Sequence, residues 1–265
     1  MRVVYPICLL KYSHLNRDYL DNQKKGGMMS TSKTETSTIA GEYSADVMYY
    51  LLHRRSVSRK KLTEPGPSDN EIRQIIKASC RVSDHGKMFP WWFMIIKDEH
   101  SQSFSELLFN LMRKNDPEKD HEKLHKKACL YTAAPVLIAV ISSPRLSKIP
   151  LWEQYMSAGA ACQNLVLASN ALGYGVNWLT EWYSYEPEVK KEMGLEKGEN
   201  IAGFFSIGTA QDVPEDRARP DTQELTTYWQ GKDTVYHKGR KYAEIKNINK
   251  LAIKGFELPN MDEEY

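Results

Sequence analysis

One segment of this sequence is dense in groups that bind anions. Residues 54–59 read Arg-Arg-Ser-Val-Ser-Arg, which places three guanidiniums and two hydroxyls close together. Arginine offers charged, forked donors and serine offers neutral ones, a combination that suits a phosphate dianion. The alternative is that these cations lie near the end of a helix, where they oppose its dipole. Arg217 and Arg219, in a loop bounded by prolines, would complete a phosphate clamp if the fold brings them to this segment.

Two further segments carry groups that could contact a ligand. The loop Arg81–Trp91 is rich in hydrogen-bonding groups, His85 among them, and it ends in Pro-Trp just before a buried strand. Ligand contacts usually lie on such loops, although a surface turn with a solvated His85 explains the pattern equally well. Asn177–Thr180 stands at the end of a predicted strand, where the aromatic surface of Trp178 could flank a planar ring. Packing of this tryptophan in the core is the alternative.

A rival chemistry is suggested by His121-Glu122-Lys123-Leu124-His125, which matches the H-E-x-x-H pattern of zinc peptidases. Its flanks, residues 118–120 and 126–127, are charged, so we expect this helix face to be solvated. A catalytic zinc helix needs a buried setting that supports its ligands. Only His237 follows downstream, in a polar tail. We therefore predict no metal site and keep a zinc metallopeptidase as the less favoured alternative.

Composition and missing motifs narrow the function classes further. The 36 basic residues nearly cancel the 34 acidic ones, so no net charge favours nucleic acid or an anionic membrane. The longest apolar run, residues 133–141, is much shorter than the roughly 18 residues of a membrane span. Four cysteines without a C-x-x-C pair indicate reduced thiols and a cytoplasmic protein. G-x-S-x-G, Walker and G-x-G-x-x-G motifs are also missing, an absence that a flavin enzyme tolerates because its cofactor carries the chemistry.

The elements that must position these residues follow from the spacing of apolar side chains. We expect a disordered N-terminal arm over residues 1–42, a folded domain over 43–230 and a C-terminal extension over 231–265. Short runs of branched and aromatic residues predict buried strands at Trp92–Lys97, Val136–Ser142, Val176–Leu179 and Ile201–Ile207. Helical spacing predicts one helix from Ser44 to the arginine block and a second that begins at a Ser68/Glu71 capping box. Two more helices are expected between the first two strands. The last two are predicted over Trp152–Leu172 and Pro187–Met193.

Taken together, the chain between about Tyr43 and Tyr228 resembles the nitroreductase family, most closely its small YdjA-type branch. Four ordered blocks carry the resemblance, namely residues 54–59, Asp84-His85 with Pro90-Trp91, residues 150–159, and Gly208-Thr209. The resemblance implies an α+β fold in which helices flank a central, mostly antiparallel sheet, and a homodimer that binds FMN at its interface. It also implies an oxidoreductase that transfers hydride from NADH or NADPH to small organic acceptors, such as nitroaromatics, quinones or enones, by a ping-pong mechanism.

The resemblance further implies which residues meet the cofactors, with the hydride chemistry carried by the flavin N5 and no catalytic side chain. The implied FMN contacts are Arg54, Arg55, Ser56, Arg81, His85, Trp178, Leu179, Thr180, Arg217 and Arg219. The segment implied for NAD(P)H is Leu167, Ala168, Ser169, Asn170, Ala171 and Leu172. The family pattern builds each site from two subunits, so we expect the arginine block and Trp178 from one chain and His85 from the other.

The sequence departs from its close relatives at three places near the implied site. Relatives have W-R-S where this chain has residues 178–180, so a positive group is missing. They have proline at the position of Ser83, and usually a basic residue where Trp92 stands. A non-catalytic flavin-binding protein with an altered pocket is therefore the alternative to an enzyme.

Overall fold

The structure, a computed structural model, describes residues 41–233. The chain divides into two units, Met1–Ala45 and Asp46–Tyr265, and the fold presented below is that of the second unit. The arm expected over residues 1–42 and the extension expected over 231–265 lie almost entirely outside the described residues. Within residues 41–233, no helix is long and apolar enough to cross a membrane.

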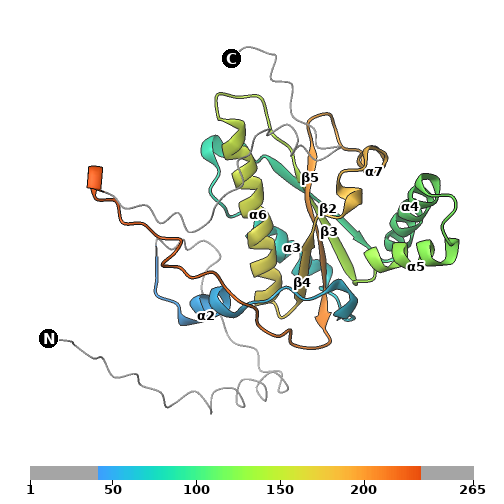
Figure 1. Cartoon of the computed structure of the whole chain (residues 1–265), viewed down its shortest axis with the longest axis horizontal. Helices are drawn as coiled ribbons and strands as arrows, with labels where there is room; N and C mark the ends of the chain where they lie inside the picture. Colours follow the sequence, from blue (N-terminus) through green and yellow to red (C-terminus); the bar gives the residue numbers. More distant parts are fainter. Residues whose placement is uncertain (1–40, 234–265) are drawn as a thin grey trace. The chain divides into compact units, whose positions relative to one another are not determined.

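A five-stranded antiparallel sheet forms the centre of this unit (Figure 1). Its order is β1 (Leu62–Thr63), β5 (Asn200–Ala210), β3 (Val136–Ser142) and β2 (Trp91–Lys97), and β4 (Gly175–Leu179) also pairs with β5. The four strands predicted from the sequence are all present. The prediction for β5 ended three residues early, because Gly208–Ala210 extend the strand to pair with β1 and β4. The two-residue β1 was not predicted, since it is too short for any periodicity.

The helices flank the sheet, which confirms the predicted α+β class (Figure 1). They are α2 (Ala45–His53), α3 (Asp69–Ser79), α4 (Glu99–Asn115), α5 (His121–Tyr131), α6 (Leu151–Ala171) and α7 (Pro187–Glu192). Short 3-10 turns, η1 to η4, cover Arg59–Lys61, His85–Lys87, Trp182–Ser184 and Gly231–Asp233. The predicted capping box is present, because the Ser68 side chain accepts from the Glu71 backbone and Glu71 bonds back to Ser68. It fixes the start of α3.

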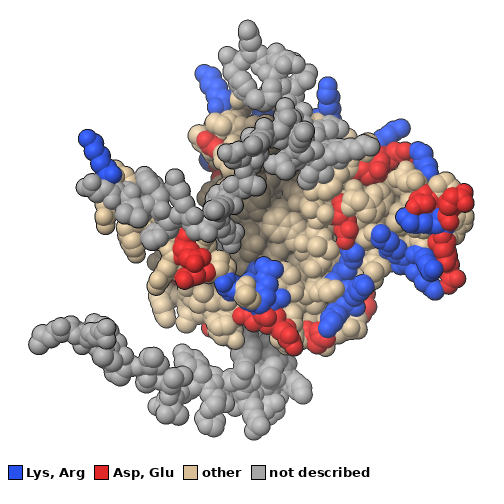
Figure 2. Space-filling view, in the orientation of Figure 1, with Lys and Arg blue, Asp and Glu red and all other residues tan. Residues whose placement is uncertain are grey.

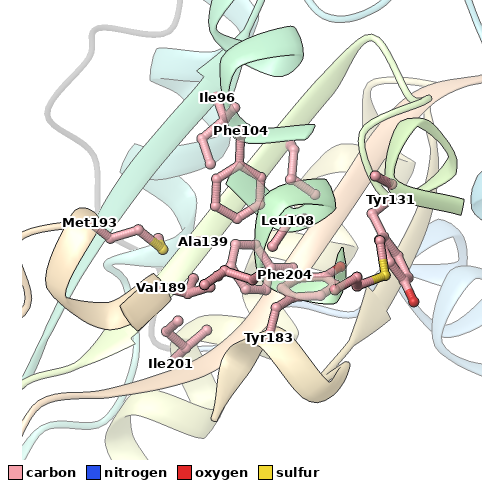
Figure 3. Close-up of a cluster of buried hydrophobic side chains, with 14 of the residues drawn as sticks. Ile96, Phe104, Leu108, Tyr131, Ala139, Tyr183, Val189, Met193, Ile201 and Phe204 are labelled. Carbon is pink, nitrogen blue, oxygen red and sulfur yellow. The ribbon is translucent and has the colours of Figure 1, made fainter. Parts of the chain in front are cut away.

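Alternating side chains of the central strands build two hydrophobic cores, one on each face of the sheet. Leu137, Ala139 and Ile141 of β3 join the core that packs against α4, α5 and α7, part of which Figure 3 shows around Phe104, Tyr183 and Phe204. The neighbours Val136, Ile138 and Val140 join the core under α3 and α6. Because successive strand residues point to opposite faces, β3 is buried at every position. This rigid centre holds the loops that carry the candidate site.

Two apolar surfaces remain uncovered by the described residues. None of the residues of α2 is buried, although its sequence carries Val47, Met48, Leu51 and Leu52. On α6, one face packs against α3 and the sheet, whereas Trp152 and Met156 on another face are 71% and 58% exposed. Gly159, which follows on the same face, has no atom within 4 Å of the position of an added Cβ. Exposed apolar side chains grouped in this way are typical of contact surfaces.

Candidate functional site

The arginine block follows α2 and is anchored beside β4. Val57 is buried, and its backbone N–H donates to the Val176 carbonyl over 3.0 Å. Residues 54–56 are therefore held next to the strand that carries Trp178. Arg54 and Arg55 are half-buried and Ser56 is exposed, with the Ser56 hydroxyl 3.5 Å from a guanidinium nitrogen of Arg54. These three side chains thus extend from an anchored segment of backbone.

The loop that contains Arg217 and Arg219 lies against this block. The Arg55 guanidinium donates to the Glu215 carbonyl and lies 3.6 Å from the Asp216 carboxylate. Asp216 also binds Arg219 over 3.0 Å. The predicted proximity of Arg217 and Arg219 to the arginine block is therefore present in the structure.

Arg54, Arg55, Arg217 and Arg219 form the arginine cluster. It carries more positive charge than its own contacts neutralise. The pKa of the Arg54 guanidinium lies below its usual value, first because of burial and then because of repulsion by Arg219, Arg217 and Arg55. Asp216 is the one carboxylate paired with these arginines among the residues that the structure describes. The Nε of Arg54 is buried there and has no hydrogen-bond partner. Buried donors without partners are rare in proteins, so an external anion is the fitting partner for this cluster.

The third arginine of the block serves a different contact. Arg59 forms an ion pair of 2.9 Å with Glu181, and its guanidinium lies 4.7 Å from the centre of the Tyr131 ring. The Glu181 carboxylate and the Tyr131 ring are thus the partners of its positive charge. Arg59 therefore holds the chain just after β4 in place and does not add to the free positive charge of the cluster.

Trp178 lies flat on the sheet beside the cluster. Its indole stacks on Phe205 with ring centres 5.2 Å apart, and its Nε1 donates to the Ala202 carbonyl over 3.2 Å. A Cβ added at Gly203 would lie 2.1 Å from that nitrogen, so only glycine leaves room for the ring. Trp178 is 37% exposed, and its uncovered surface can flank a planar ligand. The next residues, half-buried Leu179 and exposed Thr180, complete this end of β4.

The loop with His85 forms a second, separate group. Asp84 accepts a hydrogen bond from the Phe89 backbone over 2.9 Å, and His85 Nδ1 lies 2.7 Å from a carboxylate oxygen of Glu153. Arg81 is exposed, and its carbonyl accepts from Asn164. Between residues 41 and 233, no hydrogen bond or ion pair joins Arg81 or His85 to the arginine cluster. Within the described part of one chain, the two groups of predicted contacts are thus not joined to each other by such bonds.

The six residues expected to meet NAD(P)H form the last turns of α6 and its end. Ser169 is fully buried, and its hydroxyl donates to the Leu165 carbonyl. The Asn170 amide donates to the Tyr174 carbonyl, while Leu167 and Ala168 are half-buried. Ala171 and Leu172 are the exposed members of this segment. The exposed part of this segment is therefore its end, at Ala171 and Leu172.

The H-E-x-x-H segment lies on the solvated side of α5. Figure 2 shows acidic and basic side chains interspersed over α4 and α5, at the right of the view. His121 and His125 both contact the Phe109 ring edge-on, at 6.5 and 5.3 Å between ring centres, and Glu122 pairs with Lys126. Over the described part of the chain, no three histidine, cysteine or acidic side chains gather as metal ligands. Both histidines thus contact an aromatic ring and are exposed, and His125 Nδ1 also lies 3.7 Å from the Cys129 Sγ.

Three residues of these groups were not identified from the sequence. Asp216 contacts Arg55, about 160 positions earlier in the sequence, and Glu153 contacts His85, 68 positions earlier. The local sequence has no pattern that indicates either contact. Gly203 did have a signal, because an isolated glycine inside a strand often marks a close approach of another group.

Comparisons with known proteins agree on one family. The family model described as "Nitroreductase family" matches residues 51–209. The Escherichia coli strain K12 protein named "Putative NAD(P)H nitroreductase YdjA" is 32% identical over 186 residues, which are 69% of this chain and all of that protein. A nitroreductase-like family protein from Bacillus cereus has a similar fold, with a TM-score of 0.62 and 21% identity over 73% of this chain and all of that one.

A further solved structure, a Bacteroides fragilis nitroreductase with bound FMN, has a TM-score of 0.53 and 18% identity over 69% of this chain and 98% of that one. The residues that the family model matches, 51–209, contain the arginine block and all but the last residue of the sheet. The comparisons confirm the resemblance drawn from residues 54–59, 84–91, 150–159 and 208–209. The chain belongs to the nitroreductase family.

Proposed function

We propose that this protein is an FMN-dependent oxidoreductase that transfers hydride from NADH or NADPH to small organic molecules. The observation that carries the proposal is the arginine cluster, in which four guanidiniums share one paired carboxylate and a buried Arg54 Nε has no partner among the described residues. A phosphate monoester supplies the missing negative charge and several acceptor oxygens. Membership of the nitroreductase family and the FMN bound by the Bacteroides fragilis protein support the same cofactor.

The residues present fit FMN in two ways. Arg54, Arg55, Ser56, Arg217 and Arg219 would hold its phosphate, because they form the cluster with excess positive charge. Trp178, Leu179 and Thr180 at the end of β4 would lie along the remainder of the cofactor, with the indole offering an apolar surface to the flavin ring. Bound FMN would supply the hydride acceptor and donor. The protein would position its reactants and exclude water.

We propose a homodimer in which each site is completed by the partner subunit. The exposed apolar face of α6, with Trp152, Met156 and the open position at Gly159, suits close contact with a second copy of the chain, and α2 adds further apolar surface. A two-fold axis would then place Arg81 and His85 of one subunit at the arginine cluster of the other. This arrangement accounts for the absence of bonds between the two groups within the described part of one chain.

The acceptors that we propose are nitroaromatics, quinones or enones, which share a planar, electron-poor group. NAD(P)H and the acceptor would occupy the site in turn, which is a ping-pong mechanism, and NAD(P)H would approach the exposed end of α6 at Ala171 and Leu172. We place this activity in the cytoplasm, with no membrane or nucleic acid as partner.

The test is steady-state oxidation of NADH and NADPH by the purified protein with menadione or a nitroaromatic compound as acceptor. Parallel double-reciprocal plots at several acceptor concentrations would support the proposal. A protein that binds FMN but consumes neither nucleotide above the rate of free FMN would instead be a non-catalytic flavin-binding protein.

A further inference from the structure

His85 and Glu153 form a close pair on the surface of the molecule. Their Nδ1 and Oε2 atoms are 2.7 Å apart, and the side chains are 63% and 43% exposed. Exposed pairs of this kind contribute little to stability, because water competes for both groups. A carboxylate only accepts hydrogen bonds, so the imidazole must carry a proton on Nδ1. The Nε2 atom is then the nitrogen left for another partner.

The backbone segments that carry His85 and Glu153 are both held in place by contacts within the chain. The loop of His85 turns at Gly86, which has φ of 69°, and it is closed by the bond from the Phe89 N–H to Asp84. A Cβ at Gly86 would lie 3.3 Å from the Ile149 side chain, so this loop packs on the segment that leads into α6. Glu153 stands in the first turn of α6.

The start of α6 is itself fixed by a buried side chain. Gln154 accepts from the Arg145 N–H over 2.8 Å and donates to the Arg145 and Ile149 carbonyls over 2.9 and 3.2 Å. It is 3% exposed. The helix turn that carries Glu153 is therefore fixed, and the contact with His85 joins this turn to the loop of residues 84–89.

We propose that Glu153 is a positioning residue that holds His85 in the Nδ1–H tautomer and turns its Nε2 toward the flavin site. This inference rests on the proposed function, because it assigns the partner of Nε2 to FMN. A neutral imidazole in this tautomer offers an acceptor at Nε2, which suits the hydroxyl or ring N–H donors of a flavin nucleotide. The other tautomer would present an N–H there and lose that bond. Fixing the tautomer through the second nitrogen is a common use of a carboxylate beside a histidine.

The first experiment reads the tautomer directly and needs no flavin. In 15N-labelled protein at about pH 8, where an ordinary imidazole is neutral, NMR should show His85 protonated on Nδ1. The change Glu153→Gln keeps the shape of the side chain but allows it to donate as well as accept, so His85 should shift toward the Nε2–H form. The signal of His85 is assigned by its loss in His85→Ala. An unchanged tautomer in Glu153→Gln would overturn the proposal.

The second experiment asks whether Glu153 acts through His85. Glu153→Gln should weaken FMN binding by about three- to tenfold, as expected for one hydrogen bond, with an unchanged melting temperature. Glu153→Asp should recover part of the affinity, because a carboxylate only accepts hydrogen bonds and so favours the proton on Nδ1. The same Glu153→Gln change in a His85→Ala background should have no further effect. The control is Glu122→Gln, which removes a carboxylate from the surface of α5.

The outcomes separate this proposal from the proposed function. Additive losses in the double variant, or FMN affinity unaffected by Glu153→Gln, would overturn the positioning role while the function stands. Wild-type protein that fails to bind FMN would overturn the proposed function and with it the assigned partner of His85.

Discussion

Replacing Arg54 with methionine should weaken FMN binding without lowering the stability of the FMN-free protein. Methionine keeps an unbranched chain of similar length but removes the charge and the donors. The lost interaction is a charge-assisted hydrogen bond, worth about 1.5–3 kcal/mol, and FMN should bind about 10- to 150-fold more weakly. The FMN-free protein should not lose stability, because Arg54 is repelled by Arg219, Arg217 and Arg55 and its Nε is buried without a partner among the described residues.

Two measurements check this prediction. Quenching of flavin fluorescence gives the dissociation constant, and denaturant unfolding of the FMN-free protein gives the free energy of unfolding. We expect that free energy to be unchanged or higher by up to about 1 kcal/mol, the range for exposed charge pairs. Arg73→Met on the exposed surface of α3 is the matched control and should alter neither quantity. A loss of stability above about 1 kcal/mol would make Arg54 a structural residue, and an unchanged FMN affinity would remove it from the site.

Three further predictions concern the packing of Trp178, the H-E-x-x-H segment and the assembly of the site from two subunits. Gly203→Ala should lower the free energy of unfolding by about 1–3 kcal/mol, the usual cost of overpacking, because the new Cβ meets Trp178; a stability equal to wild type in urea titration would contradict the flat packing of this ring. His121→Ala should leave flavin content and NAD(P)H oxidation intact, and stoichiometric zinc that disappears with this change would contradict that expectation. Inactive Arg54→Ala and His85→Ala proteins, unfolded and refolded together, should regain activity in mixed dimers, and verified mixed dimers without activity would exclude a site shared in this way.

Much of the fold followed from local patterns. The apolar spacing predicted α6 within a residue at each end and gave β3 its full extent, and the Ser68/Glu71 pair marked the start of α3. The helices are recognisable because burial of one face imposes a period of 3.6 on the sequence, and β3 because burial of both faces makes it a short continuous apolar run. The two-residue β1 has no such period. It exists because the end of β5 offers a free edge for pairing.

The candidate site was only partly predictable. Residue types alone indicated the arginine block and suggested that Arg217 and Arg219 join it, and the structure brings them together. The contacts of Arg59 with Glu181 and Tyr131 could not be foreseen, because they depend on how distant segments meet. The apolar spacing of α2 was visible in the sequence, but only the structure shows that its residues stay uncovered by the described part of the chain.

The central claim is that the arginine cluster binds the phosphate of a flavin mononucleotide. The most direct measurement is a comparison of FMN and riboflavin, which differ in that phosphate, by fluorescence titration of the flavin-free protein. Several charge-assisted hydrogen bonds should make FMN bind at least about 100-fold more tightly than riboflavin, and Arg54→Met should narrow this ratio. Equal affinities for the two flavins, or no binding of either, would contradict the account.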